Sequence, residues 1–421
     1  MTNTFKLTLM SGVAATAIMS AGVANATNGY FSNGYGTAAK GMAGVSVAMP
    51  QDTQAGTNNP AGMKALGNRF DAGVALFSPL RDYNAGAAGG FIADADHESS
   101  QDYFLIPSFG ANWDMGDYSL GVTASANGGM NTNYATNVFN GGTNGRTGID
   151  LAQLLLGFTY ARELNDKHTI GITPTLAAQR FKASGLQGFA GISSDATNLT
   201  DNGYDYSYGY GLRLGWLGEM NDQLTLGAMA QTKMYMDKFD KYAGLFANKG
   251  EFDIPPSASL GASYKATDKL TVGADVQRIF YGSVDSISNT HNITGLGGVG
   301  TTSPLSLGGS QGAGFGWNDM NIFKLGGQYD YSDALTLRAG VSHNTDAFDN
   351  EETLFNILAP AVVNTHLSVG GTYEFAPNMS LSLAYTHAFA ADITGTNANH
   401  ANPIALDMYQ HDLEIGFTYD F

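Results

Sequence analysis

Polar and apolar residues alternate strictly along the last ten positions of the chain. One face would carry Leu413, Ile415, Phe417, Tyr419 and Phe421, and the other Asp412, Glu414, Gly416, Thr418 and Asp420. Successive side chains of a β-strand point to opposite faces, so this segment predicts a strand with one apolar and one polar face. An alternation about ten residues long is typical of a transmembrane β-barrel strand, which meets lipid outside and a polar lumen inside.

Thirteen further segments before this one are also predicted to be strands. The fourteen candidates lie near residues 69–79, 101–113, 117–127, 149–163, 167–180, 203–217, 222–234, 255–266, 269–281, 318–331, 333–345, 364–375, 378–390 and 407–421. Aromatic residues gather at strand ends, as in the interfacial girdles of membrane barrels. A soluble sandwich would also alternate, but strands this long and numerous would need two sheets with polar exteriors.

The connectors between these segments alternate strictly between short and long. The short ones lie at 114–116, 164–166, 218–221, 267–268, 332 and 376–377, and the long polar ones near 80–100, 128–148, 181–202, 235–254, 282–317, 346–363 and 391–406. Bacterial barrels have an even number of strands, short periplasmic turns and long external loops. The predicted fold is therefore all-β: a fourteen-stranded antiparallel transmembrane barrel over residues 69–421, with both ends in the periplasm.

The N-terminus reads as an export signal. Lys6 precedes an apolar run over residues 7–23, and Ala24-Asn25-Ala26 forms a small-x-small cleavage site. This pattern predicts a signal peptide over residues 1–26 and a mature chain that begins near Thr27. No later stretch approaches the ~18 consecutive apolar residues of a transmembrane helix. We therefore expect the protein in the outer membrane of a Gram-negative bacterium.

The composition limits the kinds of partner that the protein can bind. The chain contains no cysteine, and its formal net charge is −17. This negative charge argues against nucleic acid as a partner. The acids lie largely in polar connectors, where a solvated loop surface is favoured over a metal site, and we expect no cofactor and no metal. The ending at Phe421, with Tyr419 two residues earlier, resembles the recognition signal of outer-membrane barrels. The expected partners are therefore the barrel-assembly machinery, membrane lipid and lipopolysaccharide, and the protein is expected to be a monomer.

Residues 27–68 precede the first strand and show no transmembrane alternation. They are small, glycine-rich and weakly apolar. A periplasmic tail is one interpretation. A fourteen-stranded barrel, however, has a lumen wide enough to need filling, which favours a plug inside it.

Several motifs along the mature chain resemble one family. They are Gly34-Tyr35-Gly36, residues 39–44, Asn59-Pro60-Ala61-Gly62-Met63, residues 254–261, residues 267–271 and residues 335–340. In this order the chain is similar to the long-chain fatty-acid transporter family of outer-membrane proteins (FadL/TodX, OMPP1). Asn59, Pro60 and Ala61 match the motif of that family's N-terminal plug, the hatch.

The resemblance implies a route for a hydrophobic solute. In that family the solute is captured among the outer loops, passes to an inner pocket and leaves sideways where the third strand kinks inward. The matching residues here are Gly121, Val122 and Thr123, our candidates for a lateral gate. Glycine tolerates the bend or bulge that such a kink requires, although Gly121 could instead only relieve crowding in the lumen.

Candidate ligand residues fall into an apolar and a cationic set. The apolar set comprises Tyr30, Phe31 and Tyr35 of the hatch and Tyr242, Leu245 and Phe246 of an outer loop. The cationic set, placed on the lumen face by alternation, comprises Arg213, Lys324 and Arg338, which could hold a fatty-acid carboxylate or pair with lumen acids such as Asp205, Asp275 and Glu374.

The predicted function is passive uptake of hydrophobic compounds, either long-chain fatty acids or aromatic and aliphatic hydrocarbons. A general diffusion porin is the alternative, but it would be expected to lack a plug and to carry charged rings at a constriction. A lipid-modifying enzyme is disfavoured because the eight histidines are scattered and none lies in a Gly-x-Ser-x-Gly or His-Glu-x-x-His context.

Overall fold

The computed structural model describes residues 28–85, 92, 96–127, 129–139 and 145–421. The predicted signal peptide over residues 1–26 lies outside the described residues. Among the described residues, no helix has the length and apolar character needed to cross a membrane.

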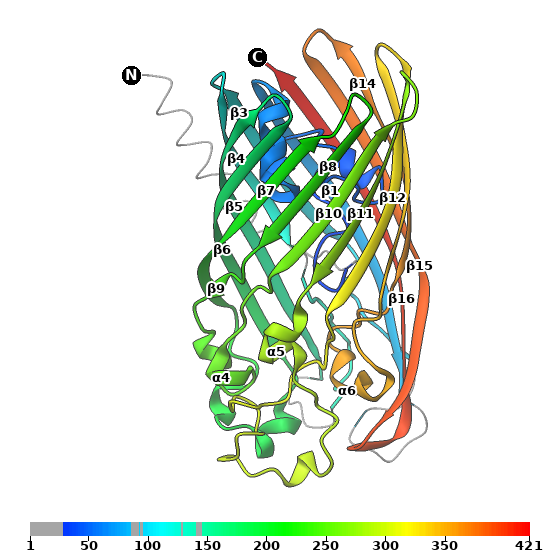
Figure 1. Ribbon diagram of the computed structural model, residues 1–421. Coiled ribbons are helices and arrows are strands. Elements are labelled where there is room, and N and C mark those ends of the chain that lie inside the picture. Colours follow the sequence, from blue (N-terminus) through cyan, green and yellow to red (C-terminus); the bar gives the residue numbers. More distant parts are fainter. Residues whose placement is uncertain (1–27, 86–91, 93–95, 128, 140–144) are drawn as a thin grey trace.

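Within the described residues, fourteen long antiparallel strands form one closed barrel (Figure 1). They are β1 (Arg69–Asn84), β3 (Phe104–Asp114), β4 (Tyr118–Asn127), β5 (Gly148–Asn165), β6 (His168–Ser184), β7 (Asp205–Glu219), β8 (Leu224–Gln231), β10 (Ser257–Lys265), β11 (Leu270–Ile279), β12 (Met320–Ser332), β13 (Leu335–Asn344), β14 (Thr365–Ala376), β15 (Met379–Asn397) and β16 (His400–Asp420). Long strands pair in chain order, and β16 pairs with β1 from Arg69–Asp420 to Asn84–Ala405. The fourteen-stranded barrel predicted from the sequence is confirmed.

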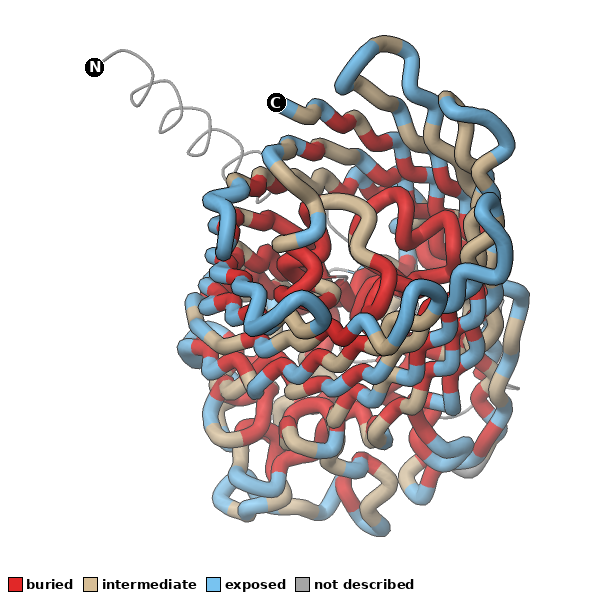
Figure 2. The backbone as a smooth tube through the Cα atoms, turned by 45° about the horizontal axis from the view of Figure 1, so that its top comes forward, coloured by how far each residue is buried: buried red, intermediate tan, exposed pale blue. Residues whose placement is uncertain are grey.

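The inner and outer faces follow the alternation. On β16, Ile415 is 51% exposed on the outer face, whereas its neighbour Glu414 is 4% exposed on the inner face. Figure 2 shows the same alternation of buried and exposed residues around the barrel. Apolar side chains therefore cover the surface that meets lipid, and polar side chains line the lumen.

One predicted loop is wrong. Residues 391–406 continue β15 and β16 as a hairpin, and only Ala398 and Asn399 lie between the two strands. The backbone ladder supplies the hydrogen bonds of this polar stretch, and the inward side chains Ile404 and Leu406 are fully buried against the loops. A polar composition alone therefore did not mark the end of these strands.

The other outer connectors fold into short elements at the end of the barrel opposite the C-terminus (Figure 1). They contain β2 (Asp96–Glu98), η2 (Gln187–Ile192), η3 (Ala196–Asn198), β9 (Tyr235–Met236), η4 (Asp240–Tyr242), α4 (Ala247–Gly250), η5 (Tyr281–Ser283), α5 (Asp285–Ser288), η6 (Leu296–Gly298), η7 (Asn350–Glu352) and α6 (Thr353–Asn356). Their apolar side chains form one large buried cluster that reaches into the barrel.

The segment before β1 lies inside the lumen, where Figure 2 shows it as a mostly buried chain. It contains α2 (Thr37–Lys40), α3 (Ala55–Asn58) and η1 (Pro60–Leu66). We call residues 28–68 the hatch. The hatch occupies the half of the barrel that carries the short turns (Figure 1).

Candidate functional site

A buried ion triad fastens the hatch to the last strand. Lys40 Nζ lies 2.7 Å from Asp412 Oδ2 and 2.8 Å from Glu414 Oε2, and all three side chains are nearly inaccessible to solvent. Thr37 Oγ1 also donates to Glu414 Oε1 at 2.8 Å. The polar face of the C-terminal strand is therefore the docking surface of the hatch. Sequence analysis missed this triad, although Lys40 stands out as a cation within a run of small residues.

Strands β11 and β12 bind a second part of the hatch, around residues 33 and 44–47. Asp275 accepts the backbone N–H groups of Ser46 (2.8 Å) and Val47 (3.1 Å). Lys324 Nζ donates to the carbonyl oxygens of Asn33 (2.9 Å) and Gly44 (3.4 Å). These contacts are between barrel and hatch, so Lys324 already has a structural role.

The two arginines of the predicted cationic set also have neutral partners. Arg338 Nε donates to Gln51 Oε1 of the hatch at 2.7 Å. Arg213 Nε donates to Gln231 Oε1 at 2.9 Å and its Nη1 to a threonine hydroxyl at 3.5 Å. No ion pair joins either of them, or Lys324, to the predicted acids within the described part of the chain. Their role toward a ligand stays a prediction.

The Asn59-Pro60-Ala61 motif starts η1 against the barrel. Asn59 Oδ1 accepts the Ala61 N–H at 3.2 Å, and its Nδ2 donates to the carbonyl oxygens of Val47 (2.7 Å) and Trp216 (3.0 Å). Pro60 occupies the first helical position, where a missing N–H costs nothing. A Cβ at Gly215 of β7 would overlap Asn59, so the motif needs this close approach of backbone to hatch.

The predicted gate residues lie on β4 beside the hatch. Thr123 Oγ1 donates to Thr53 O at 2.9 Å, and a Cβ at Gly121 would overlap the end of the Met63 side chain. Residues 121–123 are paired without interruption to β3 and to β5. The absence of a side chain at Gly121 thus leaves space for Met63 of the hatch. The pairing between β3 and β4 is lost slightly further along β4.

Pairing between β3 and β4 stops at Phe109–Ala124. Beyond it, residues 125–127 pair only with β5, and residues 104–108 pair only with β1. Ala126 belongs to the outer face by alternation, yet it is 4% exposed and packs in one cluster with the inward side chains Phe104 and Ile106. The end of β4 therefore lies on the lumen side of β3.

Four of the six predicted apolar ligand residues, Tyr30, Phe31, Tyr242 and Phe246, belong to the large buried cluster, and Leu245 packs against it. The ring of Phe246 lies 4.8 Å from that of Phe252, which lies 6.3 Å from that of Tyr30. These rings connect the outer loops to the hatch. We call the rings of Tyr30, Phe246 and Phe252 the aromatic path.

Tyr35 lies elsewhere, in a polar layer formed with amide side chains of the neighbouring strands β4, β5 and β6. Its hydroxyl donates to Asn127 Oδ1. The amide chain continues from Asn127 to Gln153 (3.3 Å) and from Gln153 to Gln179 (2.9 Å). Tyr35 therefore contributes a polar contact to the lumen rather than apolar surface.

One cavity within the large buried cluster has a volume of about 30 Å³ and is lined by loop side chains that include Leu245, Phe246 and Phe355. It can hold water but not a hydrophobic solute of the size of toluene or oleate. Such a solute could occupy this position only if loop side chains move.

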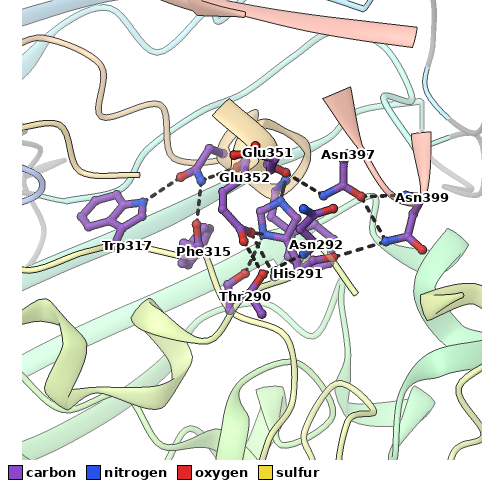
Figure 3. Close-up of polar contacts among 12 residues, drawn as sticks. Thr290, His291, Asn292, Phe315, Trp317, Glu351, Glu352, Asn397 and Asn399 are labelled. Atoms are coloured by element: carbon purple, nitrogen blue, oxygen red, sulfur yellow. Dashed lines mark hydrogen bonds and ion pairs between the residues drawn. The ribbon is translucent and has the colours of Figure 1, made fainter. Parts of the chain in front are cut away.

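A polar anchor formed by Thr290, His291 and Glu352 holds the loop that contains η7 and α6 (Figure 3). His291 is fully buried, its Nδ1 lies 2.9 Å from Glu352 Oε2, and its Nε2 accepts the Phe355 N–H at 3.2 Å. This network assigns the ring proton to Nδ1. Burial raises the pKa of Glu352, but hydrogen bonds from His291 and Thr290 outweigh that effect and hold the pKa below its ordinary value.

This anchor predicts an acid-induced loosening of the loop. A carboxylate whose folded pKa is lowered stabilises the fold fully above its ordinary pKa and loses that effect as the pH falls through the lowered value. Trp317 Nε1 donates to Asn356 Oδ1 of this loop at 2.7 Å, so its fluorescence reports on the loop. With the other two tryptophans replaced by Phe, we expect constant Trp317 emission from about pH 8 to 5 and a red shift below about pH 4.

Glu352→Gln should show the shifted emission at every pH, because a neutral amide replaces the carboxylate to which the His291 ring N–H donates. The neighbouring Glu351 is exposed, so Glu351→Gln is the matched control and should behave as the parent. Identical pH profiles for both variants would contradict the assignment.

A family model described as "Outer membrane protein transport protein (OMPP1/FadL/TodX)" matches residues 12–414. Outer membrane protein P1 of Haemophilus influenzae is 25% identical over 190 residues, which are 43% of this chain and 38% of that protein. A 47 kDa outer membrane protein of Pasteurella multocida is 38% identical over 71 residues, which are 17% of this chain and 16% of that protein. The matches thus span less than half the length of these relatives.

Solved structures share the fold over nearly the whole chain. The toluene transporter TodX of Pseudomonas putida superposes with a TM-score of 0.71 at 19% identity, covering 92% of this chain and 99% of that one. A FadL homologue of Pseudomonas aeruginosa gives 0.69 at 17% identity, covering 96% and 100%. At these identities the likeness establishes the barrel and its N-terminal segment.

Proposed function

The chain belongs to the outer membrane transport protein family OMPP1/FadL/TodX, and on that basis we propose that it is a channel for passive uptake of hydrophobic compounds. The family is one of transport proteins rather than enzymes, and membership places the barrel in the outer membrane of a Gram-negative bacterium. The proposal retains membrane lipid, lipopolysaccharide and the barrel-assembly machinery as partners, and a monomeric state.

The continuous apolar cluster from the outer loops to the hatch is the observation that carries the proposal. A solute that leaves water for this cluster gains about 25 cal/mol for each Å² of apolar surface buried. Passage straight into the periplasm would reverse this gain and is obstructed by the fastened hatch. Sideways release into membrane lipid avoids both obstacles and requires no energy source.

We place the lateral exit at the end of the β3–β4 ladder. Support comes from the loss of pairing between β3 and β4 beyond Phe109–Ala124 and from the packing of Ala126 against Phe104 and Ile106. Backbone groups without strand partners can separate at a smaller cost than a complete ladder. Gly121, Val122 and Thr123 then form the hinge next to the exit rather than the exit itself.

Uptake of labelled oleate and labelled toluene by cells that lack their own transporters tests the proposal. Cells expressing the protein should accumulate at least one of the two faster than cells with an empty vector. If a small sugar enters faster while neither hydrophobic compound does, the protein is a general porin and the proposal is wrong.

Phe246→Asp provides a sharper version of the test. A carboxylate on the aromatic path is costly to bury and repels apolar cargo, so we expect uptake to fall at least about tenfold. Tyr103 is 71% exposed, and Tyr103→Asp should leave uptake unchanged. Equal uptake by the two variants would remove Phe246 from the route.

A further inference from the structure

A polar cavity of about 240 Å³ lies at the end of the barrel that carries the long loops. Its lining includes Gln101, from the segment before β3, and Asn131 and Asn133, from the segment after β4. The outer ends of β5 and β6 complete it. We call it the outer cavity. It therefore joins the segments next to the two strands that lose their pairing beyond Phe109–Ala124.

The outward face of β6 places this cavity at the edge of the membrane. The face is apolar and exposed at Ile170 and Leu176, and it then changes to the basic residues Arg180 and Lys182. A tilted strand crosses the hydrocarbon layer in about 9–11 residues, so these two cations lie beyond its outer edge, among the lipid headgroups. Tyr206 of β7 pairs with Arg180 and is half exposed, as expected for an interfacial aromatic residue.

Two cations line the outer cavity. Arg146 is exposed, and its backbone is fixed against the end of β6, because its carbonyl oxygen lies 2.1 Å from the position of a Cβ at Gly185. The ammonium group of Lys182 lies 4.9 Å from the centre of the Tyr204 ring. Both side chains also line the open space of the cavity, so their charges are available to an anion there.

Asp150 is the acid among the described residues that line the cavity, and its carboxylate is already engaged. Its Oδ1 accepts from Asn131 Nδ2 at 2.7 Å, and its Oδ2 accepts from the Tyr204 hydroxyl at 2.5 Å. Arg180 Nη2 lies 3.8 Å from Oδ1 and compensates the charge. The two lining cations therefore leave the cavity with a net positive charge.

Asn131 adds a hydrogen-bond acceptor to the cavity. Its side chain is 3% exposed, and its Oδ1 has no hydrogen-bond partner. A buried amide oxygen without a partner is costly, and a hydroxyl donor from a ligand would satisfy it. A fully ionised phosphate has no proton to donate, whereas a sugar that carries the phosphate has hydroxyl groups. The cavity thus combines groups for an anion with a group for a sugar.

The distribution of charge around the barrel favours this side for an anionic headgroup. After Arg278 the chain contains only two cations, Lys324 and Arg338, and both contact the hatch inside the lumen. The outer segments that follow contain acids and neither Lys nor Arg; they are residues 282–317, 346–363 and 391–406. Like charges repel, so phosphate groups of the outer leaflet are disfavoured there and attracted to the cations of β5 and β6.

We propose that the outer cavity binds the phosphorylated sugar headgroup of lipid A, the membrane anchor of lipopolysaccharide. The phosphate contacts Arg146 and Lys182, a sugar hydroxyl donates to Asn131 Oδ1, and acyl chains lie along the apolar outward face of β6. A guanidinium can hold a phosphate bidentately. The bound headgroup also ties together the segments that flank the split between β3 and β4. This inference gives one partner of the proposed function a site, and its test measures lipid binding without uptake, so either can fail alone.

Lipid binding to the mature chain, refolded in detergent without lipopolysaccharide, tests the proposal. Native mass spectrometry compares diphosphorylated lipid A, the same lipid after phosphatase treatment, phosphatidic acid and inorganic phosphate. Diphosphorylated lipid A should bind at least about tenfold more tightly than the dephosphorylated lipid, because charge-assisted contacts are lost. It should also bind more tightly than phosphatidic acid, which has a phosphate and acyl chains but no sugar.

Three outcomes of this comparison would overturn the proposal. Equal binding of lipid A with and without phosphate would show that the cations are not used. Displacement of the lipid by an equal concentration of inorganic phosphate would show a site for the free anion. Equal binding of phosphatidic acid and lipid A would remove the sugar contact at Asn131.

Paired charge variants locate the site. Arg146→Gln with Lys182→Gln should weaken binding of diphosphorylated lipid A at least about tenfold and abolish its advantage over the dephosphorylated lipid. Arg162→Gln with Lys265→Gln removes the same two kinds of charge from exposed positions near the short turns and should bind as the parent does. Equal binding by the two double variants would place the lipid elsewhere and overturn the proposal. Heat-modified migration on denaturing gels checks that each barrel is folded.

Discussion

A disulfide between the hatch and β4, introduced as Thr57→Cys with Ser125→Cys, is expected to abolish uptake of hydrophobic cargo. The two hydroxyl oxygens lie 3.1 Å apart, so two sulfurs at these positions can meet with little movement of the backbone. Ser125 begins the end of β4 that pairs with β5 but not with β3, and the cross-link would hold that end against the hatch. If the exit opens by movement of either element, the oxidised protein should be inactive.

The chain itself simplifies this experiment. It contains no cysteine, so the introduced pair has no competitor, and the periplasm is oxidising. The control pair is Ser368→Cys with Thr386→Cys, whose hydroxyls lie 2.8 Å apart across β14 and β15. Reductant should restore uptake in the first variant, and the control should be active throughout. Full activity of the oxidised hatch variant would contradict an exit that opens by movement of the hatch or of β4.

Replacement of Lys40 by Met is expected to release the hatch from the last strand. The substitution leaves Asp412 and Glu414 buried, adjacent and without their common cation. Removal of one partner from a buried ion pair costs about 3–5 kcal/mol, because the remaining charge is uncompensated. The barrel ladder is untouched, so we expect an intact barrel with a mobile hatch, seen as a large rise in ion conductance across planar bilayers.

A rescue variant distinguishes loss of the ion triad from general damage. Lys40→Met combined with Asp412→Asn and Glu414→Gln removes all three charges, so conductance should return toward that of the parent. Low conductance in the single variant would show that other contacts, such as those of Asp275 with residues 46 and 47, suffice to hold the hatch. Conductance that stays high in the triple variant would contradict the charge argument.

The barrel was predictable because its physical cause is local. Lipid on one side and polar side chains on the other impose a period of two on every strand, and turns must be short on one side. The failure at residues 391–406 has the same origin. Beyond the membrane this constraint ends, and a polar segment there can pair or form a loop according to its neighbours.

The candidate site was only partly predictable. The sequence predicts Tyr30 and Phe246 as apolar contacts because large aromatic side chains are unusual in a glycine-rich plug and in a polar outer loop. Both belong to the large buried cluster. Tyr35 has the same type of side chain, yet it joins the polar layer, since its hydroxyl meets Asn127.

The sequence by itself determined the architecture: the strand number, the faces of the strands, the plug and the family. These properties depend on periodicity and on short motifs, which are read from neighbours in the chain. The tertiary structure decided what each buried charge does, placing Lys40 between Asp412 and Glu414 and Lys324 against the carbonyl oxygens of Asn33 and Gly44. The energy of a buried charge depends on partners hundreds of residues away, and only the closed barrel brings those partners together.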